Sequence, residues 1–470
     1  MKKKLDLETV LRQEKQTKKE QIWLVLSLSV PAILAQITSI AMQYIDAGMV
    51  GNMGAEATAA IGLVSTSTWL VGGTCVGTAA GFSVQVAQLV GGQREAEARD
   101  VLRQGLCALL IFGVLLAALG VAISGNLPVW LGGEAEVLED ASKYFFVYSL
   151  GIPFMQMRQL SASVMQCSGD MKTPSFLAGM LCVLDVIFNA FLIFPSRTVS
   201  VFGISFFMPG AGLRVVGAAL GSMLSEVVIA TIMLFAVCIR SKKMSLRQPG
   251  SWKWKSSTFL AAAKVTLPMT LDHIFVCSAY VVSTLIVAPL GTLAVAANSL
   301  AITAESLVYM PGYGIGSAAT VIIGQTIGAK RRDLSKTFSR LSVILGVIAM
   351  SALAVVMYVL APNIFGLLTS DGEVARLGTS VLRIELFVEP FYAAAICSNG
   401  VFRGAGDTLT PGILNLVSMW GVRIGLAIVL VPMYGLAGYW IAMSVELCFR
   451  GIIFVVRMLH GRWLKKAILV

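Results

Sequence analysis

The sequence predicts an all-α polytopic membrane protein with twelve transmembrane helices in two six-helix bundles, related by a parallel internal repeat. Composition, long uncharged runs and the repeat support this prediction. Of the 470 residues, 57% are apolar and 13% are charged, about half the charged fraction of an average soluble chain. This composition excludes an ordinary soluble enzyme and a disordered chain. The eight scattered cysteines indicate neither a disulfide framework nor a zinc site.

Long uncharged runs predict the individual spans. Residues 57–93 and 104–133 contain no charge, and Asp46 is the only charge in 22–50. Each run exceeds the roughly 20 residues that cross a bilayer as a helix, and the short alternating segments of a barrel are absent. The same pattern predicts helices that begin near residues 22, 57, 101, 143, 175, 211, 259, 296, 338, 379, 411 and 435.

The distribution of Lys and Arg predicts the orientation. With twelve spans, both termini and every second loop lie on one side of the membrane. These segments contain 27 of the 36 basic residues. Basic loops stay cytoplasmic, so we expect a multi-pass protein of the inner (plasma) membrane with both termini cytoplasmic. The net charge of +11 therefore sets topology rather than indicating a nucleic-acid partner, and no cleaved signal peptide is expected.

An internal repeat divides the chain. Pro31 and Pro268 are 237 positions apart, and the same offset relates Gln88-x-x-Gly91 to Gln325-x-x-Gly328 and Gly169-Asp170 to Gly406-Asp407. Because six spans per half is an even number, both halves cross in the same sense, an arrangement common in secondary transporters that rock around a midplane site. The predicted segments are a cytoplasmic N-terminal segment (1–21), two six-helix halves (22–239 and 259–460), a cytoplasmic linker (240–258) and a cytoplasmic tail (461–470).

Three motifs carry a family resemblance. The first span and its exit contain Pro31, Tyr44-Ile45-Asp46 and Met49-Val50-Gly51, and two loop motifs follow at Val84–Gly92 and Phe402–Thr408. Together they resemble the MATE (multidrug and toxic compound extrusion) transporters. The resemblance implies a secondary antiporter that exports small organic, often cationic or amphiphilic, compounds such as drugs in exchange for inward H⁺ or Na⁺.

Charges inside the first half are candidate coupling residues, because an ionisable group facing lipid costs at least about 2.5 kcal/mol. Asp46 lies fifteen residues after Pro31, which is a candidate helix hinge. The resemblance places the family's first-helix coupling carboxylate at Asp46; the alternative is a headgroup-zone carboxylate or a cap. Asp185 and Asn189 share a helix face and could hold a proton or small cation, or make only an interhelical hydrogen bond. The family's usual order is Asn first and Asp four residues later.

The second half offers candidate substrate-cavity residues: Asp272, Glu305, Glu389 and Tyr392. Carboxylates in a water-filled cleft would attract a cationic substrate; the alternative is pairing with Lys264 or Arg423. Pro311 and Gly312 are candidate hinge residues, since they loosen the helix after Glu305. The acid positions of sodium-coupled relatives fall at Val276 and Tyr392, which are not acidic, and this favours protons over sodium.

The sequence contains no nucleotide-binding loop and no metal-ligand cluster. We therefore expect no enzyme activity, no catalytic residues, no metal and no cofactor beyond the coupling ion, with a small organic molecule and the lipid bilayer as partners and a monomeric protein. Two alternatives remain open. A flippase or exporter of a lipid-linked precursor or an endogenous metabolite is the nearer one, and a membrane-embedded enzyme would need a nucleophile–base pair that the sequence does not offer.

Overall fold

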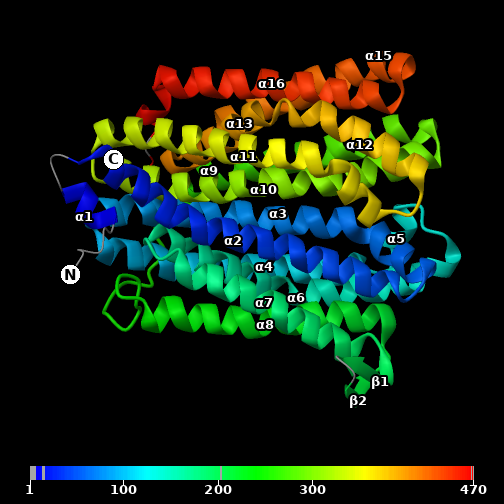
Figure 1. The fold of residues 1–470 in the computed structure, drawn as a ribbon. Coiled ribbons are helices and arrows are strands. Elements are labelled where there is room, and N and C mark those ends of the chain that lie inside the picture. Colours follow the sequence, from blue (N-terminus) through cyan, green and yellow to red (C-terminus); the bar gives the residue numbers. More distant parts are fainter. Residues whose placement is uncertain (1–6, 13–15, 202–203, 467, 469–470) are drawn as a thin grey trace. The chain divides into compact units, whose positions relative to one another are not determined.

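The computed structural model describes all residues except 1–6, 13–15, 202–203, 467 and 469–470. Parts of the predicted N-terminal segment and tail therefore lie outside the described residues. The helices of the first half are α1 (Leu7–Arg12), α2 (Lys18–Gly51), α3 (Ala55–Gly91), α4 (Glu95–Ile123), α5 (Leu127–Trp130), α6 (Ala135–Cys167), α7 (Lys172–Leu192) and α8 (Arg214–Phe235), which continues as the π-helix η1 (Ala236–Arg240) (Figure 1). A β-hairpin, β1 (Pro195–Val201) and β2 (Ile204–Ala211), lies between α7 and α8.

The second half follows the same plan. Its elements are α9 (Ser256–Val287), η2 (Ala288–Leu290), α10 (Thr292–Gly328), α11 (Arg332–Leu368), α12 (Gly372–Leu386), α13 (Glu389–Ala405), α14 (Leu409–Leu416), the π-helix η3 (Val417–Ile424), α15 (Gly425–Tyr434), α16 (Leu436–His460) and η4 (Arg462–Lys465). Because α12 with α13 and α14 with η3 and α15 follow each other almost without a break, each group occupies the place of one predicted span.

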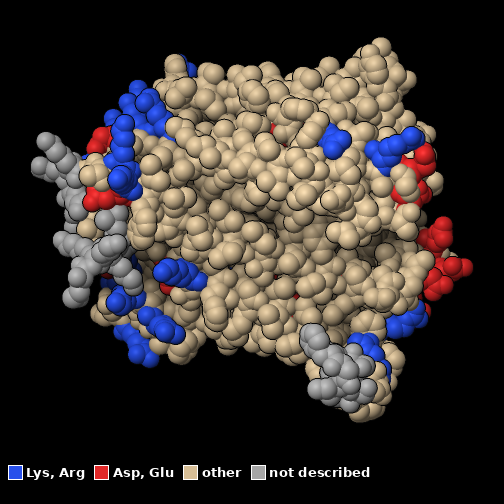
Figure 2. All heavy atoms as spheres, viewed as in Figure 1, with Lys and Arg blue, Asp and Glu red and all other residues tan. Residues whose placement is uncertain are grey.

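All twelve predicted spans correspond to helices, and ten of the helices in the described residues are long and apolar enough to cross a membrane. The other two predicted spans correspond to α6 and to the α12–α13 group. The polar residues Gln156 and Arg158 lie within α6, and a break at Phe387–Val388 separates α12 from α13. Figure 2 shows Lys and Arg mainly near the ends of the long helices, with the surface between them mostly uncharged on the face shown.

Several helices begin earlier than predicted. The expected starts near 101, 143, 338 and 379 are replaced by starts at 95, 135, 332 and 372. The hydrophobic pattern marks the lipid-crossing part of a helix, whereas charged first turns such as the one containing Glu95 and Glu97 are also helical. Asp371 caps α12, since its carboxylate accepts hydrogen bonds from the backbone N–H groups of Glu373 and Val374.

The hairpin was not predicted. Its strands are antiparallel, with Pro195 opposite Ala211 and Thr198 opposite Phe207. The Arg197 guanidinium lies over the ring of Phe194 at 3.9 Å. This short β-structure is an addition to the loop between α7 and α8 and leaves the membrane-crossing part of the described chain helical.

The chain forms two compact units. The N-terminal unit comprises Thr38–Val86 and Glu95–Phe259, and the C-terminal unit comprises Met1–Ile37, Ala87–Arg94 and Leu260–Val470. The first part of α2 and the end of α3 thus group with the second half of the sequence. The chain passes from one unit to the other within α2, within α3, at the start of α4 and within α9.

Close backbone contact joins the ends of α3 and α10 in the C-terminal unit. A Cβ added at Gly91 would overlap the backbone carbonyl of Gln325, and one added at Gly328 would overlap that of Gln88. Gly91 and Gly328 are related by the repeat offset, as are Gln88 and Gln325. The repeat motif of the sequence is therefore a reciprocal packing contact in which only glycine lets the two helices approach so closely.

The linker between the halves is fixed to α4 within the N-terminal unit. Asp100 accepts a hydrogen bond from the Ser251 N–H at 2.8 Å, and Gln104 accepts one from the Lys255 N–H at 3.0 Å. Arg103 donates to the Gln248 carbonyl at 2.6 Å. Because backbone groups of the linker are held by side chains of a long helix, the start of α9 is tied to α4.

Candidate functional site

The first candidate site lies in the N-terminal unit and consists of Asp46 on α2 with Asp185 and Asn189 on α7. We call it the acid–amide site. The Asn189 Nδ2 group donates one hydrogen bond to Asp46 Oδ1 at 3.1 Å and another to Asp185 Oδ2 at 2.9 Å. Asp185 and Asn189 are buried, with 0% and 2% of their surfaces exposed, and Asp46 is partly buried. The structure brings together the three residues that the sequence placed on two separate helices.

Small residues make room for this site. A Cβ added at Gly221 on α8 would overlap Asn189 Oδ1, so the glycine lets α8 lie directly against the amide. Ser222, next along α8, lies beside the Asp185 carboxyl, and Tyr144 on α6 lies within electrostatic range of both acids. The site is thus enclosed by residues from four helices.

The hydrogen-bond inventory of the site shows what it can bind. A side-chain amide has two N–H hydrogens, and Asn189 uses one for each carboxylate. Asn189 Oδ1 is buried and has no hydrogen-bond partner among the described residues. Two carboxylates in a low-dielectric site repel each other unless a proton or a cation binds there. The arrangement therefore suits the binding of one proton or one small cation.

The second candidate site lies in the C-terminal unit. Glu305 on α10, Glu385 on α12 and Glu389 on α13 are all buried, with 6%, 0% and 0% of their surfaces exposed. We call them the glutamate cluster. Glu385 interacts electrostatically with Glu305, Glu389 and Arg423, and Glu389 interacts with Glu305. Neither carboxylate oxygen of Glu385 or of Glu389 has a hydrogen-bond partner among the described residues.

Of the other predicted cavity residues, Tyr392 lies one turn after Glu389 on α13, and Asp272 has a partner of its own. The Tyr392 ring packs edge-on against Tyr309 with 5.6 Å between centroids, and Tyr309 packs in the same way against Tyr313 at 5.9 Å. Asp272 accepts hydrogen bonds from Asn415 Nδ2 at 3.2 Å to each carboxylate oxygen. The two additional tyrosines were not predicted, because aromatic residues inside a span give no signal of their own.

A buried ionic triad in the C-terminal unit was also missed. Glu446 on α16 forms ion pairs with Arg423 on η3 at 2.6 Å and with Arg450, one turn along α16, at 2.7 Å. Ser418 donates a further hydrogen bond to Glu446. Arg423 and Ser418 both lie on a π-helix, a rare form that is frequent at functional sites. Glu446 lies within a long apolar run, and an acid in such a run is the sequence signal that could have identified it as a functional candidate.

The N-terminal unit contains a comparable pair. Arg158 Nε on α6 lies 2.5 Å from Glu226 Oε2 on α8. The sequence offered Arg423 only as a possible partner of the second-half carboxylates. The acids that pair with Arg158 and Arg423 lie on other helices, so local sequence does not reveal them. Arg423 pairs with Glu446, so the carboxylates of Glu385 and Glu389 stay without a direct ion pair among the described residues.

The three predicted hinge residues lie in uninterrupted helices. Pro31 is inside α2, and Pro311 and Gly312 are inside α10. The segments that follow the two prolines meet, because a Cβ added at Gly314 would overlap the backbone of Ile33. Six residues after Pro31, α2 passes from the C-terminal to the N-terminal unit.

No group of three or more His, Cys, Asp or Glu side chains in the described part of the chain is arranged to hold a metal ion. Long apolar helices with buried carboxylates, amides and ion pairs define the class of the protein: a polytopic helical membrane protein whose polar interior suits the passage of ions and solutes. The chain belongs to the MatE family, whose match covers residues 31–191 and 268–429. The two matched segments begin 237 positions apart, at the repeat offset.

Relatives from bacteria match the chain over nearly its whole length. It is 24% identical to a probable multidrug resistance protein NorM of Thermotoga maritima, across 94% of this chain and 93% of that protein. It is 25% identical to the multidrug resistance protein MdtK of Yersinia pestis, across 94% of this chain and 95% of that protein. Because MatE proteins are transporters, the expectation that the chain is not an enzyme is confirmed.

Solved structures confirm the fold. A crystal structure of a MATE protein in its straight conformation superimposes with a TM-score of 0.85 at 20% identity, covering 98% of this chain and 99% of that one. A MOP-superfamily transporter from Pyrococcus furiosus gives a TM-score of 0.84 at 19% identity, covering 95% and 98%. The predicted all-helical, multi-span fold and the MATE resemblance are both confirmed.

Proposed function

We propose that this protein is a secondary antiporter that exports small organic compounds, drug-like cations and amphiphiles among them, in exchange for an inward cation. The observation that carries the proposal is the acid–amide site, where Asn189 joins Asp46 to Asp185 inside a membrane-spanning unit. The relatives described as multidrug resistance proteins support the substrate class. The two non-acidic positions, Val276 and Tyr392, favour H⁺, with Na⁺ as the alternative coupling ion.

The acid–amide site would take up the coupling ion. A proton or cation that binds Asp46 and Asp185 removes the repulsion between the two carboxylates and lets α2 and α7 approach. Its release restores that repulsion, with the Asn189 amide still bonded to both carboxylates. Because α2 belongs to both units, a change in the hydrogen bond at Asp46 alters the outer part of a helix whose first part packs against α10 at Gly314.

The second half would bind the substrate. Glu305 and Glu389 supply negative charge that attracts an organic cation, and Tyr392 with Tyr309 supplies aromatic faces on which a cation can lie. Asp272, with Asn415, adds a further carboxylate in the same unit. A proton that binds the glutamate cluster would weaken the attraction and release the substrate.

The transport cycle would then be a rocking of the two halves, residues 22–239 and 259–460, about the hinges at Pro31, Pro311 and Gly312. The linker 240–258 would stay attached to α4 throughout. The basic loops support the orientation with both termini cytoplasmic in the inner membrane, and we propose that a monomer carries out the cycle.

The buried cations argue against the alternative of a lipid-linked precursor flippase. Such a protein needs positive charge to meet an anionic headgroup. Arg158 is balanced by Glu226, and Arg423 and Arg450 share the carboxylate of Glu446, which leaves one positive charge in that triad. The carboxylates of the glutamate cluster remain. The negative charge that these carboxylates can carry favours a cationic substrate.

Proteoliposomes provide the direct test. The purified protein, reconstituted with a fluorescent organic cation, is given an imposed pH gradient, an imposed Na⁺ gradient or no gradient. We expect dye movement against its own gradient only when a cation gradient is present. Dye movement that is the same with and without an imposed gradient would reject antiport. If several cationic dyes fail to move under either gradient, the proposed substrate class is rejected.

A further inference from the structure

A groove in the C-terminal unit lies between α14 and the end of α16. Its volume is about 400 Å³, and it is lined by Leu414 on α14 and by Ile453 and Val456 on α16, with His460 and Arg462 at one end. Val456 is 60% exposed on the helix surface. The groove is therefore apolar along the helices and cationic at the helix end.

The cationic end is built into the fold. Gly461 ends α16 in the left-handed conformation, with a φ of 73°, which turns the chain into η4. Trp463 is fully buried, and its Nε1 donates to the Met458 carbonyl at 2.8 Å. Because Gly461 and Trp463 fix the residues on both sides, Arg462 is held at the mouth of the groove rather than on a free tail.

The charge of this end is not balanced by the residues of the groove. Arg457, which also lines it, forms an ion pair with Asp407 and is thereby neutralised. Arg462 and His460 remain as donors, and no carboxylate of the part of the chain that the structure describes lines the groove. The groove thus presents a positive end to whatever occupies its apolar length.

A second groove of similar size, with a volume of about 380 Å³, serves as a comparison. Arg376 and Arg383 line it, together with Pro362 and Thr379. Arg376 pairs with Glu373 at 3.1 Å, and Arg383 donates to the Tyr358 carbonyl and lies over the Tyr358 ring. Its cations are already engaged, so it lacks the open positive end of the first groove.

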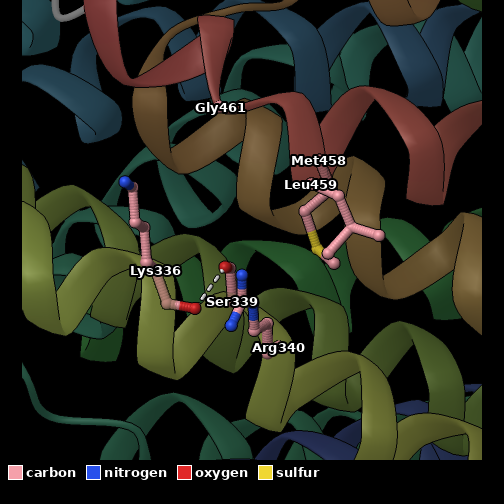
Figure 3. A pocket seen from close by; sticks show the side chains of 6 residues that line it. All are labelled: Lys336, Ser339, Arg340, Met458, Leu459 and Gly461. Carbon is pink, nitrogen blue, oxygen red and sulfur yellow. Dashed lines mark hydrogen bonds between the residues drawn. The ribbon is translucent and has the colours of Figure 1, made fainter.

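More positive charge lies on the other side of the same helix end. A small cavity there has a volume of about 50 Å³. Lys336 and Arg340 of α11 line it together with Met458 and Leu459 of α16 (Figure 3). Among the described residues, this cavity too is lined by no carboxylate. Basic side chains therefore flank the end of α16 on two sides, which raises the local attraction for an anion.

We propose that the groove between α14 and α16 is a binding site for one anionic phospholipid. The phosphate lies at Arg462 and His460, and an acyl chain lies along Leu414, Ile453 and Val456. An apolar groove with a cationic end at the limit of a membrane-crossing helix matches the two parts of such a lipid, a chain and a charged headgroup. A free inorganic phosphate would use the cationic end but leave the apolar length without an occupant.

Native mass spectrometry of the full chain tests this site without any transport measurement. The protein is extracted from vesicles of equal parts phosphatidylcholine and phosphatidylglycerol, and the retained lipids are counted. We expect one phosphatidylglycerol retained in preference to phosphatidylcholine. The Arg462→Gln variant should retain about fivefold less, the size expected for one basic residue at a membrane surface. Filling the groove with Val456→Trp should lower retention as well, although it removes no charge.

Controls distinguish the groove from general attraction to basic protein. Arg376→Gln, in the contrasting groove, should leave phosphatidylglycerol retention unchanged. Excess inorganic phosphate should not displace the lipid. Equal loss in Arg376→Gln and Arg462→Gln, displacement by inorganic phosphate, or unchanged retention in both Arg462→Gln and Val456→Trp would each overturn the proposal.

Discussion

The side-chain amide of Asn189 donates a hydrogen bond to Asp46 across 3.1 Å and so joins α7 to α2. The same amide donates to Asp185 on its own helix at 2.9 Å. The amide at position 189 thus bridges the two helices, although the family's usual order places the carboxylate at the later position. The spacing of four residues keeps both groups on one face of α7.

The order of the two α7 groups gives a first prediction. Asp185→Asn leaves α7 without a carboxylate at the site, and gradient-driven dye efflux should fall about tenfold or more, the scale of a lost coupling interaction. The double variant Asp185→Asn with Asn189→Asp restores one carboxylate and one amide on the same face, in the opposite order. Its efflux should exceed that of Asp185→Asn severalfold.

Both variants are compared in cells at matched expression of the full chain. Equal loss in the single and the double variant would show that the site requires Asp at 185 itself. Full activity of Asp185→Asn would remove Asp185 from the coupling site.

The triad of Arg423, Glu446 and Arg450 predicts a stability effect. Glu446→Gln leaves two buried guanidinium groups without their carboxylate, and breaking a buried ion pair in this way costs about 3–5 kcal/mol. Thermal unfolding in detergent should therefore begin at a clearly lower temperature. Glu373→Gln, which removes an exposed pair with Arg376, should cost about 1 kcal/mol or less, and similar midpoints for the two variants would contradict the account.

The crossing of α3 and α10 predicts another effect on stability. Gly91→Ala places a Cβ against the Gln325 carbonyl, which should cost about 1–3 kcal/mol through overpacking. Gly62→Ala lies in the same helix, where a Cβ would contact nothing within 4 Å. It should be neutral or slightly stabilising, because alanine favours helix. Unfolding midpoints of the two variants provide the measurement, and equal midpoints would refute the close contact.

The attachment of the linker to α4 can be tested by proteolysis. Asp100→Ala removes the acceptor of the Ser251 N–H and an ion-pair partner of Arg103. Trypsin should then cleave at the linker lysines, such as Lys253, several times faster than in the unchanged protein, because local opening exposes the backbone. Glu139→Ala, at an exposed pair with Lys143, serves as the control. Unchanged cleavage in Asp100→Ala would mean that these bonds do not hold the linker.

The sequence was sufficient for the helical spans and the repeat, and it named the three residues that the structure brings together in the acid–amide site. Uncharged runs identify lipid-crossing helices because the bilayer excludes charge, and Asp46, Asp185 and Asn189 are visible as polar exceptions in such runs. The repeat motif around Gln88 and Gly91 was visible too, and its meaning as a reciprocal contact with Gln325 and Gly328 came from the structure.

Partners across helices were beyond sequence reasoning. Glu446 and Glu226 are single acids in apolar runs, and nothing local shows that they pair with Arg423 and Arg158. The hairpin between α7 and α8 and the break between α12 and α13 were missed because loop length and local packing decide them rather than hydrophobic pattern. The π-helix η3 is likewise set by tertiary contacts, since it carries both Ser418 and Arg423 to Glu446.

The central claim is that Asp46 couples an inward cation to export of an organic cation. Its most direct test is dye counter-transport in proteoliposomes by Asp46→Asn, which keeps the shape and removes the charge, with Glu56→Gln on the first turn of α3 as a matched control. We predict that Asp46→Asn still folds and inserts but no longer moves dye against its gradient when a pH or Na⁺ gradient is imposed, whereas Glu56→Gln does. Gradient-driven dye movement in Asp46→Asn equal to that of the unchanged protein would contradict the account.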